Sequence, residues 1–248
     1  MSNPGTGLPP EDLERNDSIM EDIQALRPVE SAPQVVKLLA GLVTVLVPIA
    51  LVLTAVRLLL TPAFVQFEYR TPNFPADPYG FSREDRLYWS QIALDYLLND
   101  AGIDFLGDLR FGNGTPVYNQ RELGHMVDVK NVVQAALYAW YGSLILLVAL
   151  GAYAWRGKWW FEYREAVARG GWGTIYLVGA VILFVLVGFG VFFVFFHEVF
   201  FDPGTWTFAY SDTLIRLFPE RFWRDTFLVL AALAGGGGLA LAYIFKRR

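Results

Sequence analysis

The protein has 248 residues, of which 54% are apolar and 18% are charged, and its formal net charge is −4. Soluble domains carry about 25% charged residues, and here the charges stand in blocks between long charge-free stretches. This pattern excludes a soluble globular enzyme. The absence of a basic stripe excludes nucleic acid as a partner. The absence of cysteine excludes disulfides, thiolate nucleophiles and cysteine-ligated metals.

Residues 1–35 differ in composition from the rest of the chain. They are acidic, rich in proline and without a hydrophobic period, so we predict a disordered cytoplasmic tail. The segment lacks the positive start of a cleavable signal peptide, so we expect the apolar stretch that follows it to stay as an anchor.

The remaining residues, 36–248, contain four charge-free stretches that are each long enough to cross a bilayer, which takes roughly 20 apolar residues. Only helices satisfy their own backbone hydrogen bonds one segment at a time in lipid. We therefore predict an all-α membrane protein with four transmembrane helices. The four spans are Leu38–Val56, Val132–Trp155, Gly173–Phe196 and Thr226–Phe245.

The distribution of Lys and Arg predicts the orientation of these spans. Basic residues gather in the 156–169 connection and at the C-terminal end, 246–248. Since such residues stay on the cytoplasmic side, we expect both termini to be cytoplasmic. The 61–131 and 202–225 loops then lie outside the cell.

The two outer loops are predicted to form a small, mostly helical cap. Ser82 with Asp85, and Asn119 with Glu122, are typical of helix starts, and 111–115 is typical of a tight turn. The second of these helices is expected to run into the second span. The 202–225 loop mixes apolar and charged residues, which favours a position along the membrane surface.

The only two histidines of the chain are predicted to meet. His125 lies about two turns before the second span, which enters the membrane from outside, and His197 directly follows the third span, which returns there. Both imidazoles should therefore lie at the outer interface, although a lone interfacial histidine is most often a solvated polar residue. Buried ionisable groups at one membrane depth point to a functional site.

Charged neighbours could tune these histidines. Arg121, Glu122 and Asp128 share the helical face of His125, and Glu198 directly follows His197. A carboxylate that accepts a proton from one ring nitrogen leaves the other nitrogen as a base.

A metal is the less favoured reading of the same residues. His197 and Glu198 begin like a helical zinc-protease motif, but Phe201 stands where the second histidine is required. We predict neither a metal nor a cofactor, with zinc bound by two histidines and carboxylates as an alternative.

Several stretches resemble a family of four-span bacterial membrane proteins that includes the lipoprotein intramolecular transacylases. They are Asp77-Pro-Tyr79-Gly-Phe81 with Arg86, Arg121–Lys130, His197–Phe201 with Trp206, and 212–222. The resemblance covers roughly residues 35–245 and implies four spans under an extracellular cap in the bacterial cytoplasmic membrane.

The resemblance also implies an activity. Members act on a diacylglyceryl lipoprotein in the membrane and move its sn-2 acyl chain to the free α-amine of the N-terminal cysteine, which gives the lyso-form. Their two catalytic histidines match His125 and His197. We favour His125 as the base and His197 as the group at the ester, and the reverse assignment stays open. Asp77, Tyr79, Arg86 and Trp206 are candidates for cap or substrate contacts.

Two other functions are compatible with the sequence. An interfacial esterase, with or without a metal, would use the same histidines on a lipid ester. A non-catalytic membrane protein that binds an envelope partner would tolerate their replacement.

Overall fold

The computed structural model describes residues 32–246. By its contacts the chain divides into two units, 1–37 and 38–248. The predicted tail at 1–35 lies outside the described residues except for its last four, of which Gln34 already belongs to a helix. The helices are α2 (Gln34–Leu59), α3 (Pro62–Glu68), α4 (Arg83–Leu98), α5 (Asp104–Gly107), α6 (Gln120–Arg156), α7 (Trp160–Phe200), α8 (Thr213–Leu217) and α9 (Glu220–Ile244).

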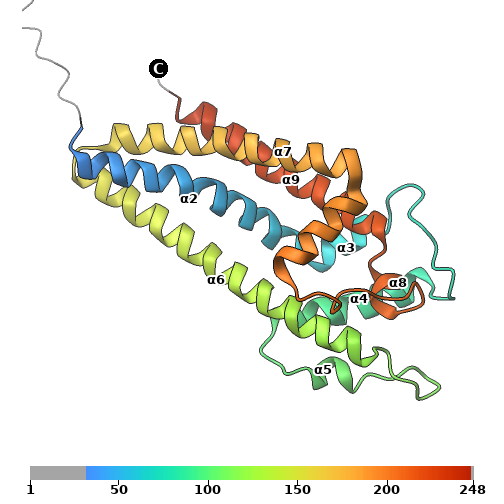
Figure 1. The fold of residues 1–248 in the computed structure, drawn as a ribbon. Coiled ribbons are helices and arrows are strands. Elements are labelled where there is room, and N and C mark those ends of the chain that lie inside the picture. The colour runs from blue at the N-terminus through green and yellow to red at the C-terminus, as the bar shows by residue number, and fades with distance from the viewer. Residues whose placement is uncertain (1–31, 247–248) are drawn as a thin grey trace, which may run out of the picture. The chain divides into compact units, whose positions relative to one another are not determined.

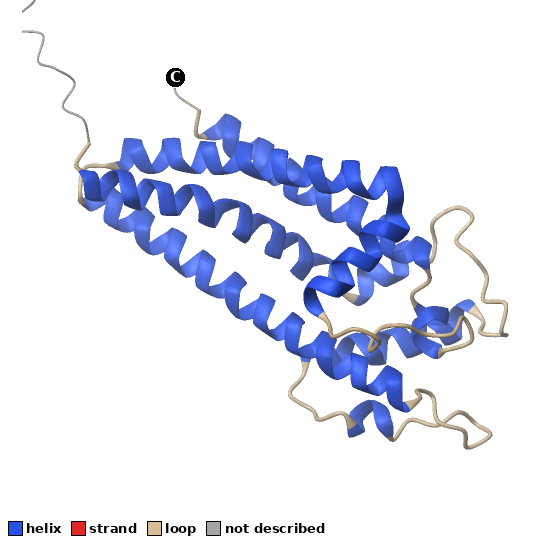
Figure 2. Ribbon diagram, viewed as in Figure 1, coloured by secondary structure: helices blue, strands red, loops and turns tan. Residues whose placement is uncertain are grey.

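The described residues form helices and loops, with no strand among them (Figure 2). Four helices, α2, α6, α7 and α9, are long and apolar enough to cross a membrane, which confirms the predicted spans. All four helices are longer than the predicted spans, most of all α6 with 37 residues and α7 with 41. The α6–α7 connection is only 157–159, because most of the basic segment at 156–169 is the start of α7.

Local signals explain where the cap helices begin. Ser82 and Asp85 form a reciprocal capping box at the start of α4, and Asn119 and Glu122 form another at the start of α6. The predicted turn is present, with Gly114 at a φ of +83°. The short helix α3 was not predicted. It begins with Thr61 as its N-cap and proline in its first turn, an arrangement that suits a helix start.

The cap gathers at the end of the bundle where α6 begins and α7 ends (Figure 1). Its core draws side chains from α4, α5, α6 and α8. The buried members are Ala93, Tyr96, Leu106, Val117, Tyr118, Leu123, Met126, Leu214 and Leu217. Leu214 and Leu217 come from the 202–225 segment, which was predicted to contribute to the cap. They pack into it because α8 turns its apolar side toward α4.

Glycines allow a close contact between α7 and α9. A Cβ atom added at Gly238 of α9 would lie 2.7 Å from the carbonyl oxygen of Gly171 of α7. Small residues commonly allow such close approaches between helices in membranes.

We expect Gly238→Ala to destabilise the protein by about 1–3 kcal/mol, because the backbone of α7 must move to admit the methyl group. Gly236→Ala is the matched control, since nothing lies within 4 Å of a Cβ atom there. Thermal unfolding in detergent measures both. Equal melting temperatures for the two variants would contradict the contact.

The helix α7 is interrupted at Gly188, which has non-helical angles of φ −164° and ψ 78°. Before this residue α7 packs along α9. After it, the last turns of α7 lean across toward the start of α6 (Figure 1). The interruption therefore decides where the end of α7, and with it His197, comes to lie.

Candidate active site

The two histidines meet at the boundary between bundle and cap. His125 lies in the second turn of α6 and His197 in the last turn of α7, and their side chains are buried. The ring centroids are 6.2 Å apart, with the planes inclined by 22°. This meeting confirms the predicted convergence of the two residues.

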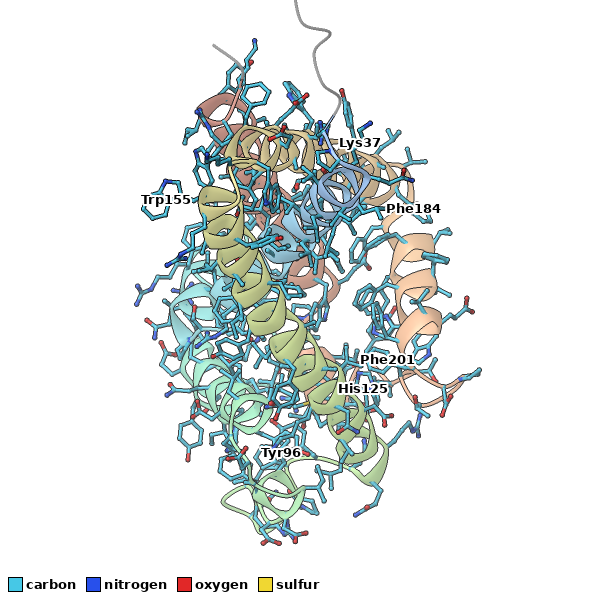
Figure 3. All side chains as sticks on the ribbon, turned by 90° about the vertical axis from the view of Figure 1, so that its left-hand side faces the viewer. Lys37, Tyr96, His125, Trp155, Phe184 and Phe201 are labelled. Carbon is cyan, nitrogen blue, oxygen red and sulfur yellow. The ribbon has the colours of Figure 1, made fainter. Side chains whose placement is uncertain are left out.

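Aromatic side chains surround the pair. The ring of Phe201 lies 4.9 Å from His125 and 5.5 Å from His197, and Figure 3 shows His125 and Phe201 beside each other, far from Trp155 at the other end of α6. Phe208 contacts His125, and Trp206 lies 4.9 Å from His197. We call Phe193, Phe196, Phe201, Trp206 and Phe208 the aromatic box.

A backbone contact fixes the tautomer of His197. Its Nδ1 lies 2.7 Å from the carbonyl oxygen of Phe193. A carbonyl oxygen only accepts hydrogen bonds, so Nδ1 carries the proton, and in the neutral ring Nε2 holds a free lone pair. His197 is thus arranged to accept a proton at Nε2.

His125 has no such support. Its Nδ1 is buried and has no hydrogen-bond partner among residues 32–246. The expected contact with Glu122 is not formed, because the two oxygens of Glu122 accept hydrogen bonds from the backbone N–H groups of Asn119 and Leu214, at 2.8 and 2.7 Å. Glu122 instead joins the start of α6 to the start of α8.

The other predicted supporting residues also lie apart from the imidazoles. Arg121 donates a hydrogen bond from Nη1 to the carbonyl oxygen of Thr207, at 3.1 Å, and so ties the loop that carries Trp206 to α6. Asp128 is half-buried and Glu198 is exposed. In the part of the chain that the structure describes, neither carboxylate forms a hydrogen bond or ion pair with a histidine.

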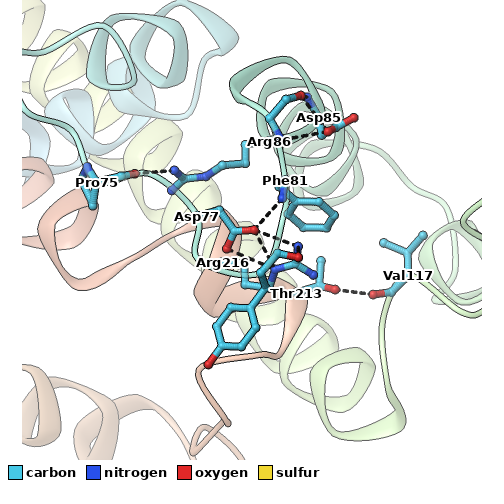
Figure 4. A network of polar contacts seen from close by, with 10 residues as sticks. Pro75, Asp77, Phe81, Asp85, Arg86, Val117, Thr213 and Arg216 are labelled. Atoms are coloured by element: carbon cyan, nitrogen blue, oxygen red, sulfur yellow. Dashed lines mark hydrogen bonds and ion pairs between the residues drawn. The ribbon is translucent and has the colours of Figure 1, made fainter.

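Asp77 and Arg86 hold the cap together (Figure 4). Asp77 is fully buried in an ion pair with Arg216, with 2.9 Å between the carboxylate oxygen and Nη2. Burial alone would raise the pKa of Asp77, but the hydrogen bonds from Arg216 and the backbone lower it below its usual value. Arg86 donates to the carbonyl oxygen of Pro75 and lies over the ring of Tyr69. Tyr79 is 50% exposed.

Two acidic residues, Glu68 and Asp225, join α3 to the start of α9. The side chain of Glu68 is buried, and its Oε1 has no hydrogen-bond partner among the residues that the structure describes. Burial and a hydrogen bond with Asp225 raise the pKa of Glu68 to about 7. Arg221 contacts Asp225 and donates to the carbonyl oxygen of Pro72 in the loop after α3.

This raised pKa makes the stability of the protein depend on pH. The folded state holds the Glu68 proton up to about pH 7 and the unfolded state only to about 4.5, so the free energy of unfolding falls as pH rises between these values. We expect Glu68→Gln to remove most of this slope, and the exposed-site control Glu220→Gln to keep it. Melting temperatures from pH 5 to 8 measure the slope, and an unchanged slope in Glu68→Gln would contradict the protonated state.

Among the described residues, no group of three or more histidine, cysteine or acidic side chains could hold a metal ion. The sequence did not identify the phenylalanines of the aromatic box as neighbours of the histidines. The phenylalanine-rich segment around His197 was visible, but such segments commonly face lipid.

The fold and the site together define a class: a four-helix membrane protein whose cap closes over a histidine pair. Comparison with known proteins gives the family. Residues 41–223 match the model of the lipoprotein intramolecular transacylase family, and the chain belongs to this family.

Individual relatives match this chain over most of its length. An uncharacterised protein from Aquifex aeolicus is 30% identical over 198 residues, which are 80% of this chain and 88% of that protein. A solved structure of the membrane-integral lipoprotein intramolecular transacylase Lit from Bacillus cereus has a TM-score of 0.65 at 21% identity, covering 86% of this chain and 93% of the other. A variant of that protein, with one histidine replaced by arginine, has a TM-score of 0.64 at 20% identity, and the match covers 94% of this chain and 95% of the other. These likenesses show a shared fold and make the chain a multi-pass membrane protein.

Proposed function

We propose that the protein is an acyltransferase that moves the sn-2 acyl chain of a diacylglyceryl lipoprotein to the α-amine of its N-terminal cysteine. The observation that carries this proposal is the buried histidine pair, in which the tautomer of His197 leaves Nε2 as a base. Membership of the transacylase family supports the same reaction.

The reaction needs a base because of the amine. An α-amine has a pKa of about 7.7–8.0, so at neutral pH it is mostly protonated and not nucleophilic. The ammonium form loses one proton to solvent, and His197 accepts a second proton from the resulting neutral amine as its nitrogen attacks the ester carbonyl carbon. The sequence favoured His125 as the base, and the hydrogen bond at Nδ1 of His197 supports the reverse assignment.

His125 then acts at the leaving group. As the carbon–oxygen bond to glycerol breaks, His125 donates a proton to the glyceryl oxygen and regains one from His197, so both imidazoles return to their neutral forms. The nucleophile and the ester belong to one substrate molecule. No covalent enzyme intermediate is therefore needed, and the aromatic box orients the substrate and excludes water.

Reconstituted protein tests this proposal with a synthetic diacylglyceryl lipopeptide in proteoliposomes. Mass spectrometry should detect an N-acyl, S-monoacylglyceryl product of unchanged mass, with the acyl chain located by fragmentation. Release of free fatty acid would favour an interfacial esterase, and loss of activity on chelation with recovery on added zinc would favour a metal enzyme. No conversion at all would favour a non-catalytic membrane protein.

We further propose that both termini are cytoplasmic and that the cap lies outside, where lipoproteins are anchored. The basic residues at the cap-distal ends of α6 and α7 support this orientation: Arg156, Lys158, Arg164 and Arg169. Because the chain has no cysteine, single-cysteine labelling tests it directly. A membrane-impermeant maleimide should label Asn113→Cys in intact cells and Lys158→Cys only after permeabilisation. The opposite result would place the histidines on the wrong side.

A further inference from the structure

Two buried side-chain nitrogens at the histidine pair have no hydrogen-bond partner within the described part of the chain: Nδ1 of His125 and Nε1 of Trp206. Trp206 lies in the loop between α7 and α8, and its ring is inclined by 38° to that of His197, with 4.9 Å between the centroids. A buried donor without a partner costs free energy. Because this indole N–H lies beside the histidine pair, it is placed to donate a hydrogen bond to a substrate oxygen.

The proposed reaction supplies such an acceptor. When the amine attacks, the ester carbonyl oxygen takes on negative charge in the tetrahedral intermediate. We infer that the Nε1–H of Trp206 donates a hydrogen bond to this oxygen and stabilises the charge, which makes Trp206 a catalytic residue. This inference rests on the proposed function. An indole N–H only donates, so Trp206 cannot replace either histidine in moving protons.

The other donors of the region have different tasks or positions. When the oxyanion forms, Nε2 of His197 holds the amine proton, which passes on to His125, and Arg121 is an exposed side chain that donates to Thr207. Arg86 lies in the cap over Tyr69 and Phe74. A fixed neutral donor is effective where aromatic side chains exclude water, because little solvent competes for the charge.

The electron balance of the step is simple. The amine nitrogen forms a bond to the carbonyl carbon while the carbonyl π electrons move to the oxygen that Trp206 contacts. When these electrons return, the bond to the glyceryl oxygen breaks and that oxygen takes a proton from His125. The indole keeps its proton throughout.

Trp206→Phe keeps an aromatic ring but removes the N–H. Loss of one oxyanion donor lowers kcat by about 10²–10³, and we expect a loss near the lower value with little change in KM. Trp159→Phe is the matched control. Trp159 is also buried with an unpartnered Nε1, but it lies in the connection between α6 and α7, at the opposite end of α6 from His125. Wild-type kcat in Trp206→Phe, or equal losses in both variants, would overturn the inference.

Two further measurements separate hydrogen bonding from packing. Benzothienylalanine at position 206 keeps the bicyclic shape and replaces N–H by sulfur, so it should lose as much kcat as Trp206→Phe. With a thionoester substrate, whose sulfur accepts hydrogen bonds poorly, the loss in Trp206→Phe should shrink to less than about threefold, since the donor then contributes little. A benzothienylalanine variant with wild-type kcat, or an unchanged loss of kcat for Trp206→Phe on the thionoester, would overturn the inference. Wild-type protein that is inactive on the ordinary ester substrate would instead refute the proposed function.

Discussion

Replacement of His197 by Asn is expected to lower the rate of N-acylation by about 10²–10⁴-fold, the usual contribution of a positioned acid–base group. Asn keeps some polarity and fits the space, but it cannot accept the amine proton at neutral pH. Mass spectrometry of the lipopeptide in proteoliposomes measures the rate, and elution in detergent as a single symmetric peak checks that the variant folds.

His125→Asn should lose activity to a similar degree, because both imidazoles lie in one buried site, 6.2 Å apart. Groups that act as a unit are not additive. The double variant should therefore be little worse than either single variant. Tyr210→Phe, at an 82% exposed position of the same loop as Trp206, is the control that should stay active. Full activity in either single histidine variant would contradict the assigned roles.

The second large effect concerns stability. Asp77→Asn should destabilise the fold by about 3 kcal/mol, because it leaves the largely buried guanidinium of Arg216 without its counter-charge. Chemical unfolding in detergent measures the change. The lowered pKa of Asp77 predicts a matching pH effect. The ionised carboxylate stabilises the fold at any pH above the ordinary pKa of 3.8, and this contribution is lost as pH falls through the lower pKa of the folded state.

An exposed ion pair provides the comparison. Arg169 and Glu165 form an i,i+4 pair at the surface of α7, and Arg169→Gln should change stability by less than about 1 kcal/mol. The double variant Asp77→Asn, Arg216→Met removes both charges of the buried pair and should recover part of the loss. Equal effects of Asp77→Asn and Arg169→Gln would show that burial of the pair contributes nothing.

Local and topological features were predictable from sequence. The capping boxes at Ser82 and Asn119 depend on residues three apart, and the structure contains both. The meeting of His125 and His197 followed from counting membrane crossings, because each crossing fixes the depth of the residues at its ends. These inferences need no knowledge of how helices pack.

The remaining features depend on contacts between distant segments. Asp77 and Arg216 are 139 residues apart, and no local pattern marks them as partners. Helical spacing predicted that Glu122 shares a helix face with His125. It contains no information on the backbone N–H of α8 that binds the Glu122 carboxylate instead. The path of α7 beyond Gly188 was equally hidden, since a glycine in an apolar span does not reveal whether the helix continues.

The interruption at Gly188 divides α7 into two segments of different direction. The second segment, whose Phe192 and Phe196 still contact Phe227 of α9, carries His197 nine residues beyond the pivot at Gly188, about 13 Å at 1.5 Å per residue. A rotation of about 10° at the pivot would therefore displace the imidazole by about 2 Å, enough to break a hydrogen bond to a reacting atom. The direction of the second segment of α7 and the distance between His125 and His197 therefore change together, so any contact that bends α7 at Gly188 also sets the alignment of the histidine pair.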